Sequence, residues 1–138
     1  NAERLGCNGI NLLVGDASSL LDINPGLKGS FQKILLDAPC SGLGTLSRHP
    51  DARWRISPCQ IVELVNLQFK LLEGVIPLLS SGGRLVYSTC TIHPRENEQQ
   101  IRDFVARHSE LRLMEEKQIW PDLLKPGDGF YAAILELK

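Results

Sequence analysis

A short apolar run that stops at a cluster of reactive side chains constrains this chain more than any other feature. Residues 34–36, Ile-Leu-Leu, lead directly into residues 37–42, Asp-Ala-Pro-Cys-Ser-Gly. Such a run is typical of a buried strand in a parallel sheet, and parallel α/β sheets place their ligand sites at the carboxyl ends of their strands. The sequence therefore predicts a strand that presents Asp37 and Cys40 at a site.

A second segment repeats this arrangement. Residues 84–91, Arg-Leu-Val-Tyr-Ser-Thr-Cys-Thr, follow the turn-forming pair Gly82-Gly83. We expect another strand of the same type, which brings Cys90 to the carboxyl end of the sheet as the first strand brings Cys40. Considered without the other motif, either cysteine could also be a small side chain buried in the core.

The rest of the chain alternates between strand and helix patterns. The expected elements are a strand at 10–14, a loop with one helical turn at 18–29, a functional loop at 41–56, a helix from 58 that kinks or ends at Pro77, a helix at 95–108, and strands at 111–115 and 130–137. The last two strands have no helix between them and should pair antiparallel. This order predicts the second half of a seven-stranded α/β domain.

The first long helix has a clear start signal and an apolar face. Ser57 is expected at the N-cap, Pro58 at the first helical position and Gln60 at the third, which together predict a capping box. Apolar residues then recur at helical spacing, at positions 61, 65, 69, 72, 76 and 79. This stripe should cover the sheet.

Composition narrows the class of protein. With 138 residues, 43% of them hydrophobic, the chain is long enough for one globular domain. No apolar stretch is long enough to cross a membrane. The sequence also does not begin with a basic segment followed by a short apolar core, the pattern of a signal peptide. Residues 1–6 lack an initiator Met and resemble the last turn of a helix closed by Gly6, so we expect the chain to begin inside a domain.

The cysteines and the charge balance bear on cellular context. The four cysteines lie too far apart for a zinc knuckle, so we expect no metal, reduced thiols and a cytoplasmic location. The formal net charge of −1 argues against a strongly basic nucleic-acid-binding domain. Basic residues nevertheless concentrate at 48–55, where a local RNA-binding patch remains possible.

Two motifs connect the chain to a known family. Residues 37–42 together with residues 88–91, Ser-Thr-Cys-Thr, resemble motifs of the Sun-type RNA (cytosine-5) methyltransferases, which include the ribosomal RNA methyltransferase B enzymes. Three more segments follow the family pattern in order: Arg48-His49-Pro50-Asp51 with Trp54, residues 94–98 (Pro-Arg-Glu-Asn-Glu), and residues 127–133 (Gly-Asp-Gly-Phe-Tyr-Ala-Ala). The resemblance covers essentially all of the chain.

The resemblance implies an α/β fold of the Rossmann-like class I methyltransferase type. Residues 1–138 would form the C-terminal portion of a single catalytic domain, with a mostly parallel sheet and an antiparallel last strand. The first strands of that fold are missing from this sequence, together with the glycine-rich loop that binds the methyl donor. We therefore expect the chain on its own to be inactive.

The resemblance also implies a reaction and roles for single residues. The donor would be S-adenosylmethionine and the acceptor a cytosine in RNA, expected to be ribosomal RNA. By match to the family, Cys90 is the attacking thiolate, Cys40 assists product release, and Asp37 holds the cytosine and lies near the donor. Asp16 matches a residue that contacts the adenine of the donor. The same two carboxylates could instead cap the backbone that follows each strand.

An RNA-binding role is expected for Arg48, Arg53, Trp54 and Arg55, because a loop of this composition could hold the neighbours of a base swung out of its stack. Two simpler interpretations remain open, namely that Arg48 anchors its own loop through Asp51 and that Trp54 packs on the domain. We predict no membrane association and no protein partner.

Two other functions are compatible with parts of the pattern. A DNA cytosine methyltransferase would use Cys40 as its nucleophile, and an RNA-binding module could keep the fold without activity. A hydrolase that pairs Cys90 with His93 is disfavoured, since no third orienting residue or nucleophile elbow accompanies them.

Overall fold

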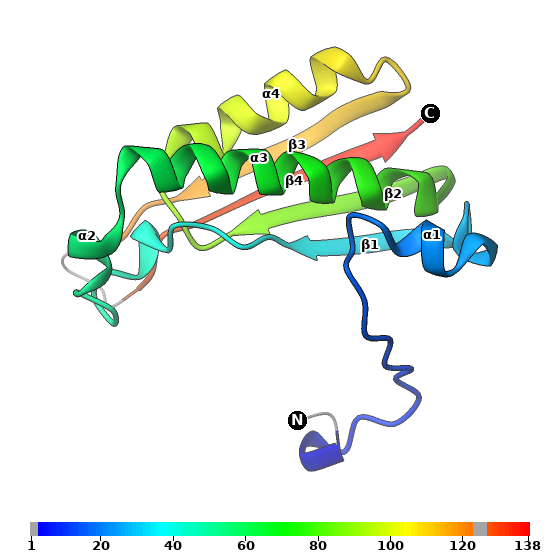
Figure 1. Cartoon of the computed structure of the whole chain (residues 1–138), viewed down its shortest axis with the longest axis horizontal. Helices are drawn as coiled ribbons and strands as arrows, with labels where there is room; N and C mark the ends of the chain where they lie inside the picture. Colours follow the sequence, from blue (N-terminus) through cyan, green and yellow to red (C-terminus); the bar gives the residue numbers. More distant parts are fainter. Residues whose placement is uncertain (1–2, 123–126) are drawn as a thin grey trace.

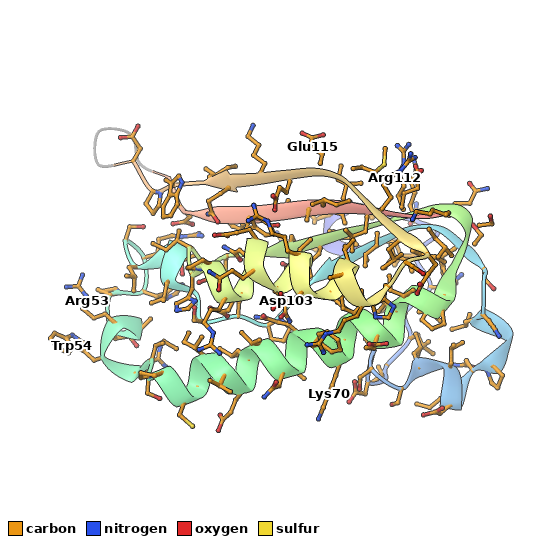
Figure 2. All side chains as sticks on the ribbon, turned by 90° about the horizontal axis from the view of Figure 1, so that it is seen from above. Arg53, Trp54, Lys70, Asp103, Arg112 and Glu115 are labelled. Carbon is orange, nitrogen blue, oxygen red and sulfur yellow. The ribbon has the colours of Figure 1, made fainter. Side chains whose placement is uncertain are left out.

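The computed structural model describes residues 3–122 and 127–138, and within them the chain forms a four-stranded sheet covered by helices on one face (Figures 1 and 2). The order across the sheet is β1 (Phe31–Asp37), β2 (Leu79–Thr89), β4 (Phe130–Leu137) and β3 (Leu111–Ile119). β1 and β2 are parallel, whereas β4 is antiparallel to both of its neighbours. Three strands therefore point one way and the last strand points the other, which confirms the predicted α/β architecture.

Two helices form the covering layer. α3 (Pro58–Val75) and α4 (Glu98–Arg107) lie along the same face of the sheet (Figure 2). The capping box is present, because Ser57 Oγ accepts from the Gln60 backbone N–H and Gln60 Oε1 accepts from the Ser57 N–H. α3 ends at Val75, immediately before Pro77 would break its hydrogen-bond ladder.

The core lies between this layer and the sheet. Its largest fully buried apolar side chains come from α3, α4, β2 and β4: Tyr87, Tyr131, Phe104, Leu72, Leu85, Ile101 and Leu135. The apolar stripe expected on α3 is correct at Ile61 and Leu72, but Phe69 is only partly buried. The residue before it, Gln68, is fully buried, so the inner face of the helix includes a polar residue.

Shorter elements connect these layers. They are the helices α1 (Leu20–Ile23) and α2 (Ala52–Arg55) and the 3-10 turns η1 (Glu3–Leu5), η2 (Pro25–Leu27), η3 (Leu43–Thr45), η4 (Ile76–Leu78) and η5 (Pro94–Glu96). The loop expected at 18–29 thus contains the predicted helical turn, and the functional loop expected at 41–56 contains η3 and α2. α2 lies at the end of the sheet toward which β1 and β2 point (Figure 1).

The strand expected at 10–14 is wrong. That segment has no regular structure, and Leu12 and Val14 are 87% and 98% exposed. A strand forms only where a partner strand accepts its hydrogen bonds. Among the described strands, β1 pairs with β2 alone, and residues 10–14 run away from the sheet (Figure 1).

Other boundaries shift by a few residues. β3 continues to Ile119, where a loop was expected from residue 117, because its outer residues pair with the start of β4. β2 begins at Leu79, before the expected glycine turn. α4 begins at Glu98, after the separate turn η5.

Candidate active site

The parallel pairing of β1 and β2 brings the two predicted cysteines together. Asp37 lies opposite Ser88 in the register, and the Ala38 N–H donates to the Ser88 carbonyl at 2.9 Å. Both chains then turn away from the sheet, and the Sγ atoms of Cys40 and Cys90 lie 3.3 Å apart. This separation is within hydrogen-bonding range for sulfur, so either thiol can donate to the other.

The two thiols share a half-buried position. Burial, together with the hydrogen bond to Cys90, raises the pKa of the Cys40 thiol to about 12. Cys40 therefore keeps its proton at neutral pH and can donate it to the sulfur of Cys90. The other two cysteines, Cys7 and Cys59, are exposed and free, so they are not part of the core.

The two predicted carboxylates have different surroundings. Asp37 ends β1 beside the thiol pair and accepts a hydrogen bond from Ser88 Oγ at 3.1 Å. Asp16 is exposed and accepts from the backbone N–H and the hydroxyl of Ser18, both at 2.8 Å. The bond from the backbone N–H contributes most, and together the two bonds lower the pKa of Asp16 below its usual value. The described contacts of Asp16 are thus confined to its own turn.

Backbone hydrogen bonds fix the loops around the thiol pair. The Gly44 N–H donates to the Cys90 carbonyl at 3.0 Å, and the Gly129 N–H donates to the Gly44 carbonyl at 2.8 Å. A Cβ atom at Gly44 would lie 2.7 Å from the Cys90 carbonyl oxygen and closer still to that of Gly129. Only glycine therefore allows these three loops to approach so closely.

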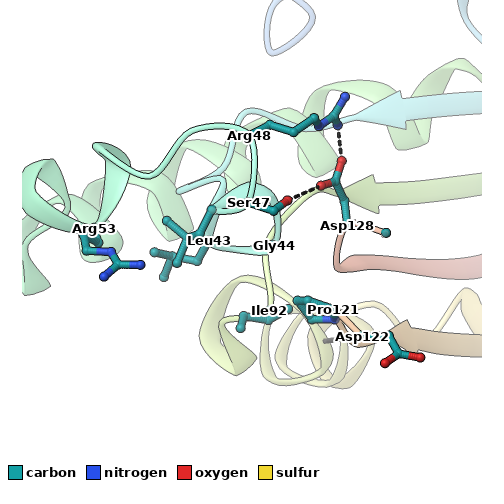
Figure 3. A pocket seen from close by; sticks show the side chains of 11 residues that line it. Leu43, Gly44, Ser47, Arg48, Arg53, Ile92, Pro121, Asp122 and Asp128 are labelled. Carbon is teal, nitrogen blue, oxygen red and sulfur yellow. Dashed lines mark hydrogen bonds and ion pairs between the residues drawn. The ribbon is translucent and has the colours of Figure 1, made fainter. Parts of the chain in front are cut away.

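An open hollow of about 730 Å³ borders this junction (Figure 3). Its apolar lining includes Leu43, Ile92 and Pro121, and Arg53 faces it from α2. At its rim the Arg48 guanidinium pairs with Asp128, which also accepts a hydrogen bond from Ser47 at 3.2 Å. Gly44 in its lining donates to the Cys90 carbonyl, so the hollow borders the loop that carries Cys90.

The four predicted RNA-binding residues lie at this end of the molecule but differ in their contacts. Trp54 is 84% exposed and projects outward with Arg53 (Figure 2), so the interpretation that it packs on the domain is wrong. Arg55 pairs with Asp51 at 2.7 Å, while Arg48 pairs with Asp128. The alternative that Arg48 anchors its own loop through Asp51 is therefore also wrong.

The sequence interpretation missed a buried polar network under the cysteine loops. Glu96, Asn97 and Gln68 are completely buried there. Asn97 accepts from Thr89 Oγ1 at 2.7 Å and donates to the Thr91 carbonyl at 3.0 Å. Two adjacent polar residues inside the family-like segment 94–98 were the available signal, but periodicity gives no reason to expect them in a core.

Comparison with known proteins decides the family. The sequence matches the family model described as 16S rRNA methyltransferase RsmB/F over residues 1–136. The chain belongs to this RsmB/F family. It is 48% identical over 113 residues to a probable ribosomal RNA small subunit methyltransferase B of Synechocystis, and 47% identical over 111 residues to ribosomal RNA small subunit methyltransferase B of Yersinia enterocolitica. These matches cover 80% and 76% of the chain but only 24% and 26% of the relatives, so the chain spans about a quarter of their length.

Solved structures agree with this membership of the RsmB/F family. NSun6 from Pyrococcus horikoshii with SFG superimposes with a TM-score of 0.82 at 30% identity, covering 99% of this chain and 36% of that one. A methyltransferase homologue from the same organism gives a TM-score of 0.79 at 28% identity, covering 99% and 48%. The suspected Sun-type resemblance and the Rossmann-like methyltransferase fold are both confirmed.

In residues 3–122 and 127–138, no helix has the length and apolar character needed to cross a membrane. Within the same residues, no three His, Cys, Asp or Glu side chains gather as the ligands of a metal ion would.

Proposed function

We propose that this chain carries the cysteine-bearing part of an active site that methylates C5 of a cytosine in RNA, with ribosomal RNA as the substrate. The observation that carries the proposal is the 3.3 Å contact between Cys40 and Cys90 at the carboxyl ends of two parallel strands. The names of the relatives support ribosomal RNA as the substrate and, with it, a cytoplasmic location.

The chemistry explains the use of two thiols. Cytosine C5 is a poor nucleophile, so the Cys90 thiolate first adds to C6 and makes C5 electron-rich. S-adenosylmethionine supplies the electrophilic methyl group that C5 attacks. Loss of the C5 proton to a base then restores the C5–C6 double bond and expels the Cys90 thiolate. Cys40 lies where it can assist this last step, in contact with the departing sulfur.

The raised pKa of the Cys40 thiol argues against Cys40 as the nucleophile. A thiol attacks as its thiolate, and a pKa of about 12 keeps Cys40 protonated at neutral pH. A protonated Cys40 can instead stabilise a thiolate on Cys90 by donating a hydrogen bond across the 3.3 Å contact. The DNA-type alternative, with Cys40 as the attacker, is thus disfavoured.

Among the described residues, two carboxylates are expected to contribute to the edge of the site for the methyl donor. Asp37 and Asp16 are exposed carboxylates, so both can accept hydrogen bonds from a ligand. By match to the family motifs, we expect Asp37 to hold the cytosine edge and lie near the donor, and Asp16 to contact the adenine. Two carboxylates alone provide little affinity, so the 138 residues by themselves should bind S-adenosylmethionine far more weakly than a version extended upstream. Equal affinity of the two would contradict this expectation.

The decisive experiment traps the covalent intermediate. The longest protein that this reading frame encodes is incubated with S-adenosylmethionine and RNA containing 5-fluorocytidine, and the products are separated under denaturing conditions. Fluorine at C5 blocks the elimination, so the attacking cysteine stays attached to the RNA. We expect the adduct to disappear in Cys90→Ala and to persist in Cys40→Ala. The reverse result would favour the DNA-type mechanism, and the absence of any adduct would favour a non-catalytic RNA-binding module.

A further inference from the structure

One buried carboxylate lies under both cysteine loops. Glu96 is completely buried in the turn η5. Its Oε1 accepts from the Ser41 backbone N–H at 2.9 Å, and its Oε2 accepts from Ser41 Oγ at 2.5 Å and from Thr91 Oγ1 at 3.3 Å. Ser41 directly follows Cys40, and Thr91 directly follows Cys90. The carboxylate thus connects the residues next to the two thiols.

The two hydroxyls also contact each other. Ser41 Oγ and Thr91 Oγ1 lie 2.8 Å apart, so together with Glu96 Oε2 they form a triangle of polar contacts in which the two hydroxyl hydrogens supply two hydrogen bonds at a time. Rotation of either loop away from the other would break two sides of this triangle. The geometry under the loops therefore opposes separation of the sulfur atoms above them.

The carboxylate is itself held from two directions. Gln68 on α3 donates from Nε2 to Glu96 Oε1 at 3.1 Å and to the Pro39 carbonyl at 2.9 Å. The Tyr87 hydroxyl on β2 donates to the Glu96 backbone carbonyl at 2.8 Å. Glu96 is thus hydrogen-bonded to the covering helix α3 and to strand β2 as well as to the two loops. Its position therefore does not depend on the loops alone.

A buried carboxyl group at this position does not favour the stability of the folded protein. A buried carboxylate loses its hydration and usually needs a cation nearby, yet in the part of the chain that the structure describes Glu96 forms no ion pair. Its partners are neutral donors. An amide side chain of the same size would fill the space at a lower desolvation cost, so packing does not explain why a carboxyl group stands here.

We propose that Glu96 is a positioning residue that holds the thiols of Cys40 and Cys90 in contact and thereby sets the rate of product release. The part that concerns release rests on the proposed function; the part that concerns the thiol contact does not. Glu96 touches neither sulfur and acts through Ser41 and Thr91.

The thiol contact can be tested by oxidation. Diamide, an oxidant for thiols, removes two electrons and two protons from Cys40 and Cys90, joins their sulfur atoms and is reduced to the hydrazine. The rate at which the Cys40–Cys90 peptide pair appears is measured by mass spectrometry in the longest protein that the reading frame encodes. Exposed Cys59 serves as an internal standard for reaction with the oxidant. Glutamine would have to donate to the two hydroxyls from which Glu96 accepts, so the hydrogen bonds to Ser41 and Thr91 reverse their direction. We therefore expect Glu96→Gln to slow disulfide formation about tenfold.

Matched variants separate positioning from folding. Glu98→Gln removes the same charge two residues away in the same segment and should leave the rate unchanged. Glutamine fits the volume of Glu96, and the hydroxyls of Ser41 and Thr91 can accept as well as donate, so Glu96→Gln should melt no lower than the parent. If it unfolds, Thr91→Val removes one side of the triangle and should itself slow the reaction. Equal disulfide rates in the parent and the folded variant would overturn the proposal.

The catalytic part has its own test. With unmodified RNA and S-adenosylmethionine, Glu96→Gln should accumulate the covalent protein–RNA adduct, as we also expect of Cys40→Ala, because release is slowed while attack is kept. In the Cys40→Ala background, Glu96→Gln should have no further effect on adduct lifetime. A further loss of the same size there would show that Glu96 does not act through Cys40. If the parent forms no adduct at all, the proposed function fails, whereas the oxidation result still decides the positioning role.

Discussion

The Arg48 guanidinium is paired with the Asp128 carboxylate, 80 residues further along the chain. This pair joins the loop after Cys40 to the segment that leads into β4, across the rim of the hollow (Figure 3). Arg48 is therefore largely neutralised, whereas Arg53 faces the hollow and makes no ion pair among the residues that the structure describes. The two arginines should contribute differently to RNA binding.

The first prediction separates them by salt dependence. Arg53→Ala should weaken binding of a short RNA and reduce the slope of log affinity against log salt by about one, because one phosphate contact is lost. Arg48→Ala should change the slope less. Arg84→Ala, which removes a cation paired with Glu136, is the matched control. Fluorescence anisotropy at several salt concentrations measures the slopes, and equal slopes for Arg53→Ala and the control would contradict the assignment.

The second prediction follows from the raised pKa of Cys40. Alkylation by iodoacetamide requires the thiolate, so labelling of Cys40 should keep accelerating with pH until about pH 12. The exposed thiol of Cys59, which lies on α3, serves as the reference. Peptide mass spectrometry after short exposures gives both rates in one sample. A plateau for Cys40 near pH 8 to 9, as for an ordinary thiol, would refute the prediction.

The third prediction concerns the glycine at the loop junction. Gly44→Ala should destabilise the protein by about 1–3 kcal/mol, because the added methyl group meets the carbonyl oxygens of Cys90 and Gly129. Gly26→Ala is the control, since a Cβ atom there meets nothing within 4 Å. Urea unfolding of both variants measures the difference. Similar stability losses in the two variants would show that the close approach is unimportant.

The fourth prediction concerns pH and His108. Burial lowers the pKa of His108, but hydrogen bonds with Glu110 at 2.8 Å and Glu73 at 3.1 Å outweigh it and raise the pKa above its usual value. A raised folded-state pKa gives stabilisation that is complete below the unfolded pKa, about 6.5, and is lost as pH rises through the folded value. The melting temperature should therefore fall as pH rises from about 6 toward 8.

Replacing His108 by Gln provides the comparison for that pH range. The variant lacks the titrating ring, which also stacks on Phe104 with the ring centroids 4.3 Å apart. It should be less stable than the parent at low pH and show a flatter dependence of melting temperature on pH. If the two curves run parallel, the stabilisation does not come from protonation of His108.

Local sequence patterns were sufficient for the parts of the fold that depend on local chemistry. The apolar run before Asp37 predicted β1, and Ser57 with Gln60 predicted the start of α3. The thiol pair could be predicted because Cys40 and Cys90 each follow such a strand. These features are determined by a few neighbouring residues and by the general geometry of parallel sheets.

Features that depend on distant partners were not predictable in the same way. Residues 10–14 have the composition of a strand, but no described strand pairs with them. Gln68 and Glu96 are polar residues that belong to the core because each meets the other there, at 3.1 Å. Arg48 finds its partner in Asp128 rather than in nearby Asp51. For Gln68, Glu96 and Arg48 the deciding contact lies far away in the sequence.

The junction at Gly44 is made of main-chain atoms, and this has an evolutionary consequence. The links from Gly44 to Cys90 and from Gly129 to Gly44 use only N–H and carbonyl groups, and the two glycines keep side chains out of the junction. Side chains on the surrounding loop, such as Leu46 and Arg53, can therefore be exchanged without displacing the reactive sulfur atoms. Substitutions of this kind, accumulated over evolution, would change what the hollow accepts while the two thiols keep their places.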